Sequence, residues 1–150
     1  MKEKYRILVD SSVFFAAFLR FGPVFEVIRF ILEDPRFVLI RCEGIDRETR
    51  RKIRDRIPGA LEEWDKFIAL TDAWIGSKVE YYTDRQLEEF GLKGYIDIRH
   101  RDPDDQFVVD YAVMVEPFLL LTVDKDLLEE KRITEELPVA TPTDFKRIFF

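Results

Sequence analysis

Short apolar runs recur along this chain, and stretches with helical periodicity separate them. Runs such as RILV and FLLL show no alternation of polar and apolar residues, which is typical of strands buried on both faces of a parallel sheet. We expect strands at residues 5–9, 36–40, 79–82, 117–122 and, more weakly, 138–141. The sequence therefore predicts one α/β domain over residues 1–150, with helices on both faces of a central, mostly parallel sheet in three layers, α/β/α.

Helical periodicity accounts for most of the remaining chain. We expect helices at residues 12–20, 23–33, 45–56, 60–70, 84–90, 105–115 and 125–132. The closing PTDFKRIFF is typical of a capped helix, with Thr143 as the cap before Asp144.

The most apolar segment, VFFAAFLRFGPVFEVIRFIL, does not qualify as a membrane span. Charged side chains interrupt it, and Gly22-Pro23 divides it into two helices. We expect two packed helices, with some of their phenylalanines in a homodimer interface.

Composition narrows the class of protein. The chain has 150 residues, of which 47% are hydrophobic, and this is typical of a folded domain. Its single cysteine, Cys42, forms no internal disulfide, which suits the cytoplasm. A net charge of −6 argues against general nucleic-acid binding but leaves room for a local basic face.

Acidic residues stand where two of the expected strands end. Asp10 follows ILV, and Asp124 follows the strand in LLLTVDKD. Ligand sites of open α/β sheets lie at the carboxyl ends of the strands, so the two carboxylates are expected on one edge if these strands are neighbours. The alternative for Asp10 is a simple helix cap. Three further acids open the helix in RDPDDQFVVDYA: Asp102, Asp104 and Asp105.

Crowded carboxylates need a cation or protons. Two like charges 4 Å apart repel by about 4 kcal/mol at an effective dielectric constant near 20. Oxygen ligands suit Mg²⁺ or Mn²⁺, whereas zinc prefers His and Cys, and this chain has one of each. Hydrolysis of phosphodiesters is the chemistry that such a site favours.

The order of the segments VDSSV, DPDDQFVVDYA, TVDKDLL and ATPTDFKRIF resembles the PIN-domain family, to which the VapC-type toxin ribonucleases belong. The resemblance implies a PIN-like fold and an Mg²⁺- or Mn²⁺-dependent endoribonuclease that leaves 5′-phosphate and 3′-hydroxyl ends. It also implies RNA as substrate and, if the chain is a toxin, a protein antitoxin as partner.

The resemblance also assigns roles to four acids, which would bind metal and act in catalysis. They are Asp10, Glu48, Asp105 and Asp124. Asp102 and Asp104 compete with Asp105 for the third position, and Asp126 is a further acid that we expect to cap a helix. Glu48 has an alternative as well, an i,i+4 ion pair with Lys52.

One position departs from the family pattern. Ser12 stands where the family commonly has Asn, two residues after the first Asp. A hydroxyl there still hydrogen-bonds a neighbouring carboxylate, but it offers fewer groups. The alternative function is therefore a catalytically weak or inactive PIN-like module that binds RNA or a protein.

Four arginines on the central helix suggest how a substrate would be bound. They are Arg47, Arg50, Arg51 and Arg54, spaced so that they share one helix face. Together with Ser12 they are the expected substrate-binding residues, gripping RNA phosphates. The alternative is a solvated charged face without a ligand.

Overall fold

The computed structural model describes residues 4–92 and 106–150. Within them, five strands form one sheet in the order β3-β2-β1-β4-β5, and every neighbouring pair is parallel. The strands are β1 (Tyr5–Val9), β2 (Phe37–Cys42), β3 (Val79–Tyr82), β4 (Leu119–Leu121) and β5 (Val139–Ala140). The predicted strands and the parallel arrangement are confirmed.

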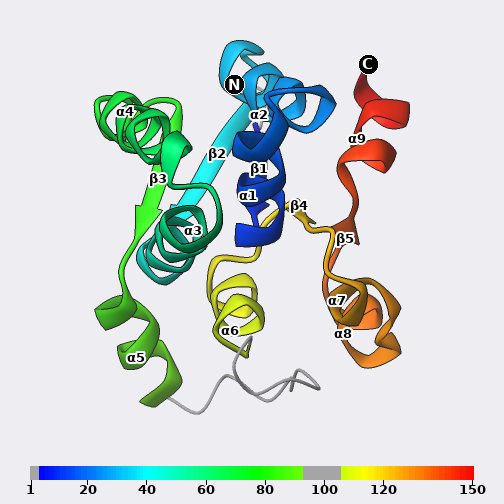
Figure 1. Cartoon of the computed structure of the whole chain (residues 1–150). Coiled ribbons are helices and arrows are strands. Elements are labelled where there is room, and N and C mark those ends of the chain that lie inside the picture. Colours follow the sequence, from blue (N-terminus) through cyan, green and yellow to red (C-terminus); the bar gives the residue numbers. More distant parts are fainter. Residues whose placement is uncertain (1–3, 93–105) are drawn as a thin grey trace.

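The helices cover both faces of this sheet. Their bounds are α1 (Ser11–Arg20), α2 (Pro23–Glu33), α3 (Glu43–Arg56), α4 (Leu61–Asp72), α5 (Asp84–Leu92), α6 (Gln106–Val115), α7 (Lys125–Glu129), α8 (Lys131–Glu136) and α9 (Pro142–Phe149), with a short 3₁₀ turn at Pro58–Ala60 before α4. Figure 1 shows α2, α4 and α9 on one side of the sheet and α5, α6, α7 and α8 on the other. The three-layer α/β/α architecture is confirmed, but the helix expected at 125–132 is two helices that meet at Glu130.

The winding of the chain reverses the strand order at one point of the sheet. From β1 the chain adds β2 and β3 on one side, and then crosses to add β4 and β5 on the other. The strand order therefore reverses between β1 and β4, which is where open parallel sheets place their ligand sites. Asp10 follows β1 and Asp124 follows β4, so each acid comes after one of these two strands.

Three caps determine where helices begin. Asp10 caps α1 and accepts a hydrogen bond from the backbone of Ser11. Asp124, not Asp126 as expected, caps α7. The cap of α9 is Thr141 in place of the predicted Thr143, because a proline without an N–H fits the first helical position and moves the cap to the residue before it.

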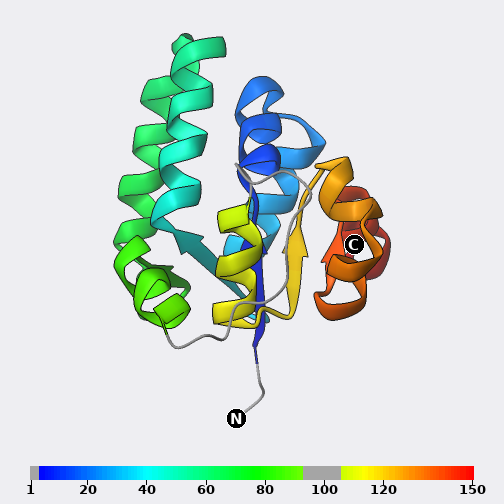
Figure 2. The same ribbon diagram turned by 90° about the horizontal axis from the view of Figure 1, so that it is seen from below.

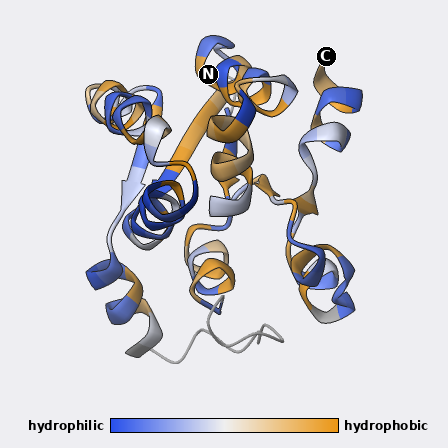
Figure 3. Cartoon of the chain, in the orientation of Figure 1, coloured by the Kyte–Doolittle hydropathy of each residue, from blue (hydrophilic) through white to orange (hydrophobic). Residues whose placement is uncertain are grey.

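The apolar segment at 13–32 is two helices, as expected. Phe21 takes a left-handed conformation (φ 50°) that ends α1, and Pro23 opens α2. No helix in the described ranges is both long and apolar enough to cross a membrane. Figure 3 shows the hydrophobic residues concentrated in β2 and α1, while α3 is strongly hydrophilic.

An aromatic cluster joins the sheet to the last helix. Phe37 of β2 is fully buried, and its ring centroid lies 5.5 Å from that of Tyr5, 5.7 Å from Phe30 and 4.9 Å from Phe149. The ring of Phe145 lies 5.5 Å away on the same side. β1, β2, α2 and α9 thus share one packed core.

We predict that Phe37→Ala lowers the free energy of unfolding by about 3–5 kcal/mol, because it leaves a cavity among four rings. Chemical denaturation measures the loss. Ile148→Ala is the control, because Ile148 on α9 is 66% exposed, and its free energy of unfolding should stay within about 0.5 kcal/mol of the wild type. Similar losses in both variants would show that the Phe37 cluster is not the core.

Candidate acidic site

Asp10 is a buried carboxylate held by three donors. It lies directly after β1 and is 4% exposed. Its Oδ1 accepts from the Ser11 backbone N–H at 2.7 Å, while its Oδ2 accepts from the Ser12 hydroxyl at 2.8 Å and from the Thr122 hydroxyl at 2.9 Å. Asp10 therefore caps α1, which was the alternative to a metal ligand, and it lies at the edge of the sheet where a site is expected, while its role as a ligand stays a prediction.

The environment of Asp10 disfavours its charge. Burial raises the pKa of this carboxyl, while the hydroxyls of Ser12 and Thr122 and the charge of Lys52 act to lower it. The nearby charge of Glu48 raises the pKa further. The folded chain therefore holds a proton at Asp10 more readily than the unfolded chain does.

The same two hydroxyls connect Asp10 to the end of β4. The Ser12 hydroxyl accepts from the Val123 N–H at 3.2 Å, and the Thr122 hydroxyl accepts from the Asp124 N–H at 3.0 Å. Asp10 and Asp124 thus lie on one edge of the sheet, as predicted. The Asp124 carboxylate accepts from the Asp126 N–H at 2.9 Å and so caps α7.

Glu48 reaches the site from α3. Its Oε1 lies 3.3 Å from the Lys52 ammonium, which is the alternative that the spacing offered. The same ammonium donates to the Ser11 hydroxyl at 3.1 Å and so bridges α3 to the residue after Asp10. The other oxygen of Glu48, Oε2, is buried and accepts no hydrogen bond from any described residue.

This chemistry fits a hard divalent cation. A buried carboxylate oxygen without a donor is costly and calls for a cation or a proton. Asp10 and Glu48 supply oxygen ligands, which Mg²⁺ and Mn²⁺ prefer. Among residues 4–92 and 106–150, however, no group of three or more acids, histidines or cysteines is spaced to hold a metal ion. The predicted acids Asp102, Asp104 and Asp105 lie outside the described residues.

The four arginines of α3 differ in their surroundings. Arg47 pairs with Asp84 at 2.7 Å, Arg50 with Asp65 at 3.1 Å and Arg54 with Asp55 at 3.1 Å. Arg51 is exposed and makes no ion pair with a described side chain. The four side chains therefore do not form one uniform face, because residues 47 and 50 lie next to acids of α5 and α4.

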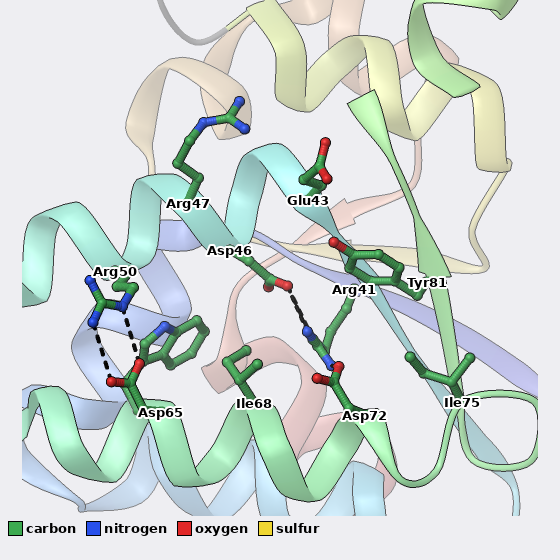
Figure 4. Close-up of a pocket in the computed structure, with 11 residues that line it drawn as sticks. Arg41, Glu43, Asp46, Arg47, Arg50, Asp65, Ile68, Asp72, Ile75 and Tyr81 are labelled. Carbon is green, nitrogen blue, oxygen red and sulfur yellow. Dashed lines mark hydrogen bonds and ion pairs between the residues drawn. The ribbon is translucent and has the colours of Figure 1, made fainter. Parts of the chain in front are cut away.

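A separate hollow of about 640 Å³ lies between α3, α4 and β3 (Figure 4). At its base Arg41 is 3% exposed and donates to Asp46 at 2.8 Å, to Asp72 at 2.6 Å and to the Thr71 hydroxyl at 3.0 Å. The ring of Tyr81 lies 5.2 Å from the guanidinium. This network was not predicted from the sequence, although an arginine at the end of an apolar strand was a signal for it.

The network of Arg41 joins β2, α3 and α4. Burial raises the pKa of Asp46 to about 6, and the ion pair with Arg41 opposes that shift. Figure 2 shows α3 and α4 side by side as a pair that projects from the sheet. Arg41 lies at the root of this pair and ties α3, which carries Glu48, to β2 and α4.

Comparison with known proteins supports the fold. No protein-family model matches the chain, and no curated protein does either. Among solved structures, the chain is similar to the crystal structure of Mycobacterium tuberculosis VapC20, a sarcin–ricin loop cleaving toxin. The TM-score is 0.53 at 18% identity, over 81% of this chain and 92% of VapC20. At this identity the similarity shows the fold, which is PIN-like.

Asp10 gives a prediction for the metal-free protein. Folding raises the pKa of Asp10 above the value of about 3.9 that it has in the unfolded chain. The stability that this carboxyl contributes is therefore fully present below about pH 3.9 and is lost as the pH rises through the pKa of the folded state. In chelator, Asp10→Asn should therefore be more stable than the wild type at pH 7, with the difference vanishing below about pH 4. Thermal unfolding across this pH range measures the difference in stability. Asp55→Asn is the control, because Asp55 is exposed and its variant should be as stable as the wild type. A difference in stability that stays the same between about pH 4 and pH 7 would contradict the raised pKa of Asp10.

Arg41 gives a prediction for the frame of the site. Arg41→Met leaves Asp46 buried without its partner, so we expect a loss of about 3 kcal/mol in unfolding free energy. Arg41→Met/Asp46→Leu should recover part of it. The control Arg50→Met breaks an exposed pair and should cost less than about 1 kcal/mol. Equal losses from Arg41→Met and Arg50→Met would mean that the buried network does not hold α3.

Proposed function

We propose that this chain is an Mg²⁺- or Mn²⁺-dependent endoribonuclease. One observation carries the proposal: a buried Asp10, at the point where the strand order reverses, lies beside a glutamate whose buried oxygen has no described donor. The similarity in fold to a toxin that cleaves the sarcin–ricin loop supports RNA as the substrate.

The proposed metal ligands are Asp10 and Glu48, with Asp124 and Asp105 completing the set and the same four acids forming the catalytic centre. When bound, the cation would activate a water molecule and stabilise the charge that develops on the leaving oxygen. Cleavage would leave 5′-phosphate and 3′-hydroxyl ends. Ser12 and Thr122 fix the Asp10 carboxylate from two segments of the chain, so that it needs no reorganisation to act as a ligand.

Ser12 therefore takes over an orienting role in place of the usual asparagine. Its hydroxyl donates to Asp10 and accepts from the chain after β4. This contact supports an active site over a binding module without catalysis, and a cleavage assay separates the two.

Substrate RNA would lie along the exposed arginines of α3. Arg51 and Arg54 are the strongest candidates for phosphate contacts, since Arg51 has no described acidic partner and Arg54 pairs only with its exposed neighbour Asp55. Arg47 and Arg50 would first have to leave their acids.

Further partners belong to the same proposal. A protein antitoxin would block the acidic site, and a second copy of the chain would cover apolar residues left exposed at the end of α1. Leu19 and Phe21 are 45% and 48% exposed there. We place the protein in the cytoplasm, where the buried Cys42 stays a thiol.

The decisive experiment is RNA cleavage with and without Mn²⁺. Structured and single-stranded RNAs should be cut only with the metal, and Asp10→Asn should lower the rate at least 100-fold, because it removes a ligand charge without altering shape. Asp55→Asn, on the far end of α3, is the control and should keep full activity. Metal-dependent binding of RNA without cleavage would favour the inactive module, and full activity of Asp10→Asn would refute the proposal.

The arginine face has its own test in the salt dependence of RNA binding, measured with Asp10→Asn to prevent cleavage. Arg51→Glu/Arg54→Glu should weaken binding and flatten the slope of log K against log salt by about 0.7 for each phosphate that is no longer neutralised. Arg29→Glu on α2 is the control, since this exposed arginine lies on another helix. An unchanged slope would place the RNA elsewhere.

A further inference from the structure

One basic residue of α3 points inward. The side chain of Lys52 is 24% exposed, whereas those of Arg47, Arg50 and Arg54 are 67%, 48% and 56% exposed. A lysine has a long flexible stem that ordinarily carries its charge into water, so the position of residue 52 on the helix does not by itself bury the ammonium. Interactions on the inner side must therefore hold it.

Two contacts hold the ammonium of Lys52. It lies 3.3 Å from Glu48 Oε1 and donates at 3.1 Å to the hydroxyl of Ser11. The second contact crosses from α3 to the first turn of α1, directly beside Asp10. An i,i+4 ion pair forms on a helix surface without a contact to a second helix. Because Lys52 also bonds Ser11, the pair of Glu48 and Lys52 is part of the acidic site.

The charges around Lys52 explain why it is held. Asp10 is 4% exposed and the Glu48 side chain is 15% exposed, so both carboxylates have little access to water. Like charges in such surroundings repel strongly unless a positive charge lies between them. In the described residues, Lys52 is the cation that contacts Glu48 and reaches the residue next to Asp10.

We propose that Lys52 is the counter-ion of the metal-free acidic site and competes with the divalent cation for Glu48. This inference rests on the proposed function. A metal ion at Glu48 Oε2 would share one carboxylate with the ammonium at Oε1, and the repulsion between the two positive charges turns the ammonium outward on its flexible stem. Metal binding therefore gives up one ion pair, and the observed affinity is lower than the acids alone would provide.

The test is Mn²⁺ binding by titration calorimetry, together with thermal unfolding in chelator, and neither readout needs catalysis. Lys52→Met removes the competing charge, so it should bind Mn²⁺ about tenfold or more tightly than the wild type. In chelator it should melt at a lower temperature, because the carboxylates then repel without compensation. Lys52→Gln loses the charge but keeps a polar end, and should show the same tighter binding.

Two controls isolate the charge at this position. Lys52→Arg keeps it and should bind Mn²⁺ within about threefold of the wild type. Arg51→Met removes a charge from the neighbouring, exposed position of the same helix, and should also leave the affinity close to that of the wild type. If Lys52→Met does not fold in chelator, added Mn²⁺ should restore its folding, and Lys52→Gln supplies the affinity.

The outcomes separate this inference from the proposed function. Mn²⁺ binding by the wild type that requires Asp10 but is equal or weaker in Lys52→Met and Lys52→Gln would overturn the inference alone. The absence of Mn²⁺ binding from the wild type and from every variant would overturn the metal site itself. Binding detected only after the charge at residue 52 is removed would support the competition strongly.

Discussion

The structure depends on a carboxylate buried where a parallel sheet reverses its strand order. Burying Asp10 is costly, and the fold offsets that cost with a backbone N–H and two hydroxyls on the two adjacent strand ends. The hydroxyl of Thr122 also receives the N–H of Asp124, so the same bond pattern positions the next acid. The cap of α1, the end of β4 and the candidate site are therefore built from the same set of hydrogen bonds.

Helix α3 separates two polar regions with different roles. On one side, Glu48 and Lys52 face Asp10, and one buried oxygen of Glu48 accepts no hydrogen bond from a described residue. On the other side, Arg41 is surrounded by Asp46 and Asp72 and holds α3 and α4 together. We propose that the first region binds a cation, whereas the second ties α3 to β2 and α4.

Much of this arrangement could be predicted from the sequence. Apolar runs without alternation indicated the parallel sheet, and the carboxylates after ILV and LLLT indicated the sheet edge at which Asp10 and Asp124 lie. Contacts between distant residues could not be predicted in this way: that Arg41 is buried beside Asp72, or that Lys52 reaches Ser11, depends on how α3 packs. The cap of α9 is Thr141 and not the predicted Thr143, because Pro142 occupies the first helical position, and the role of Asp105 stays a prediction.

The most direct test of the proposed metal site is a crystal structure of the protein soaked in Mn²⁺, with the ion located by its anomalous scattering. We predict a peak about 2.1 Å from a carboxylate oxygen of Asp10 and from Glu48 Oε2, with the Lys52 ammonium moved away from Glu48. A peak elsewhere, or none at Asp10 with the Lys52 contact intact, would contradict this prediction.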